Sequence, residues 1–159
     1  MYNVIIEHLK LLTINFTQRK KGSTPSKLAG LSGIMYILPV FFIKENGFEM
    51  NLYKLLWILN AIFVISSDYF FYNTDSIIHG IDRWLATLNV IISFIITLQH
   101  YPFWKCCIYA FPPLYFVYKS KVAKNENDYI FNHTMWHVTG PTIVSYILYQ
   151  IQLNSKIII

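Results

Sequence analysis

Residues 78–98 of the chain read IHGIDRWLATLNVIISFIITL, an almost continuous run of apolar side chains. A helix of this length can cross the hydrocarbon core of a bilayer, which is about 30 Å thick. Apolar residues make up 55% of the 159 residues and charged residues only 13%, whereas soluble domains carry roughly 25% charged residues. Because a small globule in water needs polar groups over most of its outside, the composition indicates a protein whose solvent is lipid.

Four further apolar segments accompany this run, and together they predict an all-α fold, a polytopic transmembrane helix bundle of about five spans. The expected spans are residues 28–43, 52–71, 78–98, 104–118 and 129–151. We expect one transmembrane domain over 28–152, preceded by an amphipathic and basic segment, 1–27, that lies on the membrane surface. The remaining residues, 153–159, are expected to form a C-terminal tail.

The net charge of +5 arises from lysine and arginine residues that lie between the apolar runs. This distribution is typical of a topology signal, and it lacks the continuous basic face that would indicate nucleic-acid binding. The N-terminal segment and the loops on its side of the membrane carry more of these residues than the opposite side. The positive-inside rule therefore predicts a multi-pass protein with a cytosolic N-terminus. The sequence indicates neither the organelle nor an oligomeric state.

Polar and ionisable residues gather at the ends of three predicted spans, where they are costly and usually functional. The second and third spans form an antiparallel hairpin, and the fifth runs parallel to the third. The end of the second span and the starts of the third and fifth therefore face one side of the membrane. The residues at these three ends are Ser66, Ser67 and Asp68, then His79, Asp82 and Arg83, and finally His133 and His137.

His133 and His137 are one helical turn apart, so both rings leave the same helix face. Two imidazoles at this spacing can bind one divalent metal, and zinc is the usual partner of such ligands. With His79 as a third ligand, one zinc position would stay open for water. Asp82, which shares a helix face with His79, would orient that water or act as the base. Ser67 would donate a hydrogen bond to a developing oxyanion.

The same residues also have purely structural interpretations. Interfacial histidines often serve as hydrogen-bond partners, and for His133 and His137 this interpretation is about as well supported as metal binding. Asp82 could cap the third span, where an acidic group meets the positive end of the helix dipole. Ser67 could simply allow two helices to approach closely.

The closing segment NHTMWHVTGPTIVSYIL (132–148) and the Ser67–Asp82 spacing resemble the membrane metallohydrolase superfamily of alkaline ceramidases, progestin/adiponectin receptors and GPI-processing Per1 proteins. The resemblance implies that His133 and His137 are zinc ligands, with Asp82 holding the zinc-bound water and Ser67 assisting. The family has seven helices and a Ser-x3-His motif, whereas this chain has about five spans. Phe71 stands at the position of that histidine, and we expect His79 to replace it.

The leading hypothesis from the sequence is an intramembrane zinc-dependent hydrolase that acts on a lipid amide bond. Its substrate would be a ceramide-like membrane lipid that enters laterally from the bilayer. A second hypothesis is a non-catalytic receptor, lipid-binding or structural protein of the same fold, which the missing family histidine favours. A third is a haem-binding membrane protein, with His79 and either His133 or His137 as the axial ligands.

Overall fold

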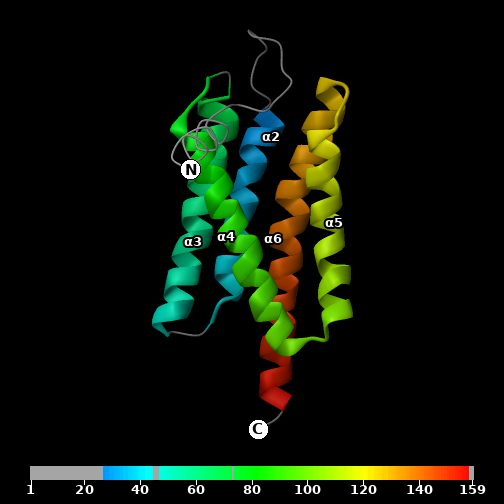
Figure 1. Cartoon of the computed structure of the whole chain (residues 1–159). Helices are drawn as coiled ribbons and strands as arrows, with labels where there is room; N and C mark the ends of the chain where they lie inside the picture. Colours follow the sequence, from blue (N-terminus) through cyan, green and yellow to red (C-terminus); the bar gives the residue numbers. More distant parts are fainter. Residues whose placement is uncertain (1–26, 45–46, 73, 158–159) are drawn as a thin grey trace, which may run out of the picture.

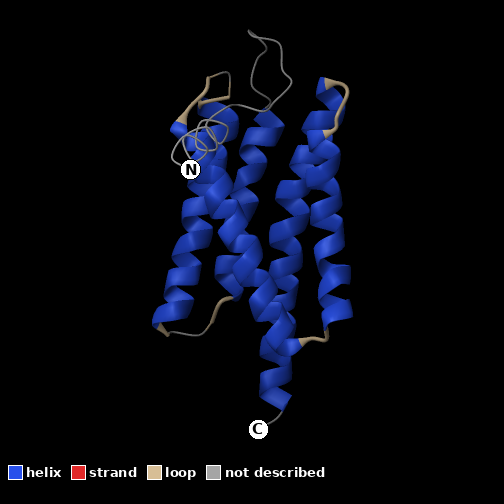
Figure 2. Ribbon diagram, in the orientation of Figure 1, coloured by secondary structure: helices blue, strands red, loops and turns tan. Residues whose placement is uncertain are grey.

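The computed structural model describes residues 27–44, 47–72 and 74–157, and within these ranges every regular element is a helix (Figures 1 and 2). This confirms the all-α prediction. The elements are α2 (Lys27–Ser32), η1 (Gly33–Phe42), α3 (Phe48–Ile65), η2 (Ser66–Phe70), α4 (Ile77–His100), α5 (Phe103–Lys121) and α6 (Glu126–Ile157). Because η1 continues α2 and η2 continues α3, the described chain forms five helical segments.

Two of these segments, Phe48–Phe70 and Ile77–His100, are long and apolar enough to cross a membrane. The segment Lys27–Phe42 is also apolar but is shorter. The predicted amphipathic segment, 1–27, lies outside the described residues except for Lys27, which begins α2. At the other end, α6 continues through Ile157, into the range predicted as a tail.

Side chains next to the helix ends set where two of the helices begin. The Ser76 hydroxyl accepts a hydrogen bond from the backbone N–H of Ile78 and so caps α4. The Asn125 side chain accepts one from the backbone N–H of Asp128 and holds the first turn of α6. These two caps fix the starts of the helices that carry Asp82 and the histidine pair.

The core lies between α3, η1 and α6, where Tyr36, Trp57, Val64 and Leu148 are buried together. In Figure 1, α6 runs between the first helical segment and α5, and it packs against both. The first segment approaches α3 closely because of Gly33. A Cβ atom at that position would lie 2.7 Å from Cγ1 of Val64 and 3.2 Å from the backbone nitrogen of Ile65. Only glycine therefore allows this approach.

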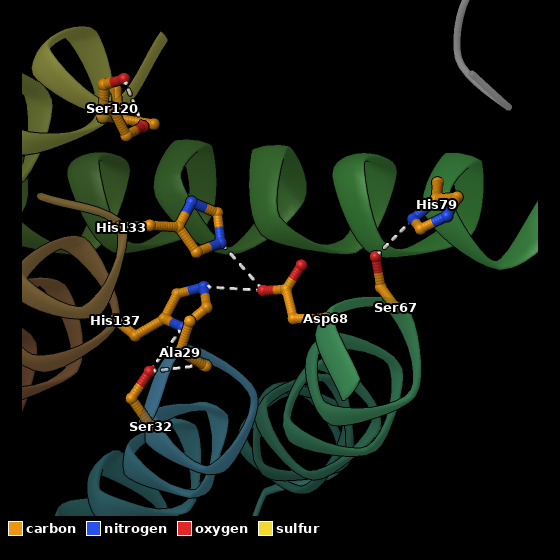
Figure 3. Close-up of polar contacts among 9 residues, drawn as sticks. Ala29, Ser32, Ser67, Asp68, His79, Ser120, His133 and His137 are labelled. Atoms are coloured by element: carbon orange, nitrogen blue, oxygen red, sulfur yellow. Dashed lines mark hydrogen bonds and ion pairs between the residues drawn. The ribbon is translucent and has the colours of Figure 1, made fainter. Parts of the chain in front are cut away.

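Helix α3 ends in a wider, π-helical turn, η2, in which the backbone N–H of Phe71 donates to the carbonyl oxygen of Ser66 at 2.9 Å. The turn directs the neighbouring residues Ser67 and Asp68 into the interior of the bundle, toward α4 and α6 (Figure 3). Single π-helical turns of this kind often occur at functional sites.

Candidate metal centre

Asp68, His133 and His137 form the one cluster within the described ranges in which three ligating side chains could hold a metal ion. Their ligand atoms all lie within 4.8 Å of one another. Figure 3 shows Asp68 entering from the end of α3 and pointing between the two rings of α6. One oxygen of Asp68, Oδ2, lies 2.8 Å from Nε2 of His133 and 3.5 Å from Nε2 of His137.

The two separations from Asp68 are close to those around a tetrahedral metal ion, and the two imidazole nitrogens, within 4.8 Å of each other, would move closer together on binding. Ligand atoms about 2.0–2.1 Å from zinc in tetrahedral geometry lie roughly 3.3 Å apart. The contact between Asp68 and His137 already has nearly this length. The contact between Asp68 and His133 would need to lengthen by about 0.5 Å, which a small side-chain rotation achieves. Two imidazoles and a carboxylate are also a ligand set that zinc accepts.

A hydrogen bond from the first helical segment fixes which nitrogen of His137 faces Asp68. The Ser32 hydroxyl donates to the carbonyl oxygen of Ala29 at 2.7 Å, so its oxygen accepts from Nδ1–H of His137 at 2.9 Å. With its proton on Nδ1, the neutral ring keeps a lone pair on Nε2, the atom that points to Asp68. Ser32 therefore holds His137 in the form that could bind a metal ion through Nε2. Sequence reasoning did not assign a role to Ser32.

Aromatic contacts hold both rings of the pair. His133 stacks on Tyr129, one turn earlier on α6, with ring centroids 5.0 Å apart. His137 meets Tyr36 edge to face at 5.5 Å, and the two imidazoles meet each other edge to face at 4.4 Å. His137 is buried and His133 is partly exposed, so the cluster can be approached from the side of His133.

His79, the predicted third ligand, lies apart from this cluster, on the far side of Ser67 (Figure 3). Its Nε2–H donates to the carbonyl oxygens of Phe71 and Thr74, at 3.1 and 2.8 Å. Its Nδ1 lies 2.6 Å from the Ser67 hydroxyl. Both ring nitrogens are therefore engaged, and the structure brings Asp68, and not His79, to the histidine pair.

Asp82 and Ser67 lie next to the cluster and bond to each other. The Asp82 carboxyl group forms a hydrogen bond with Ser67 and is close enough to interact electrostatically with Asp68. Since Ser67 also contacts Nδ1 of His79, its hydroxyl joins His79 to Asp82. One proton can be shared along this row of three side chains, because a hydroxyl both donates and accepts.

All of these groups line one cavity of about 550 Å³. Its walls include Asp68, Asp82, His133 and His137, and Arg83 and Lys121 also line it. A cavity of this size can hold a small ligand or part of a lipid. The cluster therefore faces a space large enough for a bound molecule to contact its side chains.

Asp68 is the residue whose role the sequence analysis missed. In the sequence, Asp68 is one of the converging polar groups, but spacing alone predicts His79 as the third ligand. A signal was present in the sequence, because the buried face of α3 contains Tyr53, Trp57 and Val64. Continuing this helical spacing by three and four residues brings Ser67 and Asp68 to the same face.

No protein-family model matches this chain, and no curated protein or solved structure shows significant similarity to it. The geometry of the cluster and its cavity therefore carries the functional conclusion.

Proposed function

We propose that the protein is a zinc-dependent hydrolase embedded in a membrane, and that it acts on the amide bond of a lipid. The observation that carries this proposal is the cluster of Asp68, His133 and His137 beside a cavity of about 550 Å³. Catalytic zinc sites commonly use three protein ligands and keep a fourth position open. Two histidines and one carboxylate facing a cavity match this pattern.

We also propose that all five described helical segments cross the membrane, and not only the two long apolar ones, and that the N-terminus lies in the cytosol. Outward-facing side chains support this extension. On α5, Phe103, Trp104, Ile108 and Phe111 are all more than half exposed. A contiguous row of large apolar side chains is unfavourable in water and favourable against lipid tails.

A zinc ion held by the cluster would supply a Lewis acid that polarises a carbonyl group and makes water a better nucleophile. The protein would supply the rest of the chemistry. Asp82 lies on the cavity wall, where its carboxylate can accept a proton from the attacking water. Asp82 can then return this proton to the leaving amine, while Ser67, between Asp82 and His79, positions the Asp82 carboxyl group.

A lipid amide suits the surroundings of the cluster better than a water-soluble substrate. Apolar side chains such as Val64, Val90 and Leu114 line the same cavity as the ionisable groups. A molecule with an apolar chain and one polar linkage would meet both kinds of wall. Arg83 and Lys121 at the cavity also allow a polar headgroup to be bound.

Metal analysis of the purified protein in lipid nanodiscs tests the proposal. We expect about one zinc ion per chain, and less than about a tenth of that in each of Asp68→Asn, His133→Ala and His137→Ala. His100→Ala is the matched control, because His100 is exposed at the other end of α4, and it should keep full zinc. A wild-type protein without zinc would refute the proposal.

A panel of N-acyl lipids, including ceramides, then separates an enzyme from a binding protein. We expect release of free fatty acid by the wild type, and at least a hundredfold slower release by Asp82→Asn with zinc still bound. Zinc without turnover of any lipid in the panel would instead indicate a non-catalytic receptor or lipid-binding protein. The cavity beside the metal centre would serve that function equally well.

A further inference from the structure

A second cavity, of about 90 Å³, lies beside the first, between α4, α5 and α6. Its walls are almost entirely apolar, with Phe94, Ala110 and Ile143 among them. The two cavities are neighbours, because five residues line both of them. These shared residues are Tyr36, Ala86, Val90, Leu114 and Trp136. One elongated molecule could therefore extend from the metal centre into the second cavity.

Asn89 is an exception among the walls of this second cavity. It is 2% exposed, and neither Oδ1 nor Nδ2 of its amide has a hydrogen-bond partner. Two other polar side chains of the wall are satisfied locally: Ser93 donates to the carbonyl oxygen of Asn89 and Thr97 to that of Ser93. Nε1 of Trp57, a single donor on the same wall, is also without a hydrogen-bond partner. A buried amide with no partner is costly, so the Asn89 amide is explained if a bound molecule supplies the missing partner.

The chemistry of the amide defines the class of that partner. An asparagine side chain offers an acceptor and a donor side by side, and a hydroxyl group can complement both. The surrounding walls are apolar, which favours a hydroxyl carried by a hydrocarbon chain. Asn89 lies seven residues beyond Asp82 on α4, about 10 Å along the helix axis. The hydroxyl would therefore lie well along the chain and not beside the reacting group.

We propose that the second cavity binds the hydrocarbon chain of the lipid and that Asn89 selects chains with a hydroxyl group near mid-chain. This inference deepens the proposed function and rests on it, since it names the substrate class of the same site. It also predicts a property of binding alone, which does not require zinc or turnover.

Binding of two lipids to the full chain in nanodiscs tests this inference. The lipids are octadecanamide and the same amide with one hydroxyl at mid-chain, each measured by displacement of a fluorescent fatty amide. We expect the wild type to bind the hydroxylated amide about tenfold more tightly, both with zinc and after chelation. In Asn89→Leu the preference should vanish, while binding of the plain amide stays equal or becomes tighter, because the unpaired amide is gone.

Asn60→Leu is the matched control for this experiment. Asn60 is also buried with both amide atoms unpartnered, but it is not among the residues that line either cavity. The preference should therefore survive in Asn60→Leu. If Asn89→Leu does not fold, Asn89→Met, whose flexible side chain adapts to its neighbours, gives the same comparison.

Equal binding of the two lipids by the wild type would overturn the inference, as would a preference that Asn89→Leu leaves unchanged. Either result would mean that Asn89 is satisfied by ordered water only. The experiment distinguishes a failure of this inference from a failure of the proposed function. A chain that binds no zinc but still prefers the hydroxylated amide would refute the proposed hydrolase and support the Asn89 site. A chain that binds zinc and hydrolyses lipid amides without this preference would support the hydrolase and refute the Asn89 site.

Discussion

Replacing Ser32 with alanine removes the hydroxyl that holds the ring of His137. Ser32 accepts from Nδ1–H of His137 at 2.9 Å and is itself held by the carbonyl oxygen of Ala29. In the Ser32→Ala variant the ring can turn, and its proton can move to Nε2, the atom that faces Asp68. A ring with the proton on Nε2 cannot bind a metal through that atom, so part of the protein would lack a ligand.

The expected loss follows from this geometry. Removing a hydrogen-bond partner of a metal-bound histidine typically lowers metal affinity 10–100-fold, which corresponds to about 1.4–2.8 kcal/mol. His137 is only 2% exposed, so water cannot readily replace the Ser32 hydroxyl. The carbonyl oxygen of Ala29 is a second hydrogen-bond acceptor for the His137 ring, so the variant keeps one partner and we expect a loss near the lower end of that range.

Competition with a chromophoric zinc chelator, on metal-stripped protein in nanodiscs, measures the affinity directly. Ser66→Ala is the matched control, because Ser66 also bonds to a backbone carbonyl, that of Ile62, but lies at the surface. Its zinc affinity should change less than about twofold. If Ser32→Ala binds zinc as tightly as the wild type while His137→Ala has lost it, the proposed role of Ser32 in fixing the His137 proton is wrong.

Two further variants test the packing and the assignment of ligands. Gly33→Ala should lower the free energy of unfolding by about 1–3 kcal/mol, because its Cβ would meet Val64 at 2.7 Å. A lower Tm would show this effect. Gly47→Ala is the control and should leave the Tm unchanged, because its Cβ would meet nothing within 4 Å. His79→Ala should keep about one zinc ion per chain but lower Tm, because it leaves backbone carbonyls without their donor. Loss of zinc in His79→Ala would show that His79 is a ligand after all.

The helices could be predicted from the sequence because long apolar runs are expected to form helices. A backbone in a bilayer must satisfy its hydrogen bonds internally, so each apolar run becomes a helix. The predicted run 78–98 corresponds to α4, Ile77–His100, and the small difference arises because Ser76 caps the helix. A bundle in which all five helical segments cross a membrane stays a prediction, since two of the described segments are long and apolar enough to do so.

The histidine pair could also be predicted, because His133 and His137 lie on one uninterrupted helix, where spacing determines direction. The approach of Asp68 to this pair could not be predicted in the same way. The assignment of His79 rested on its spacing from Asp82, and that spacing says nothing about the carbonyl oxygens of Phe71 and Thr74, which occupy Nε2 of His79. Contacts of this kind depend on how a loop folds back, which periodicity does not describe.

The π-helical turn Ser66–Phe70 has a consequence for how relatives of this chain can be recognised. Such a turn contains one residue more than an α-helical turn, and one residue changes the direction of a side chain by about 100°. A relative with an ordinary α-helix here would have one residue fewer in this turn, so the equivalent of Asp82, which follows the turn, would lie one column away in an alignment without gaps. Distant relatives are therefore better matched by the cavity that a carboxylate and two imidazoles share than by the number of residues between them.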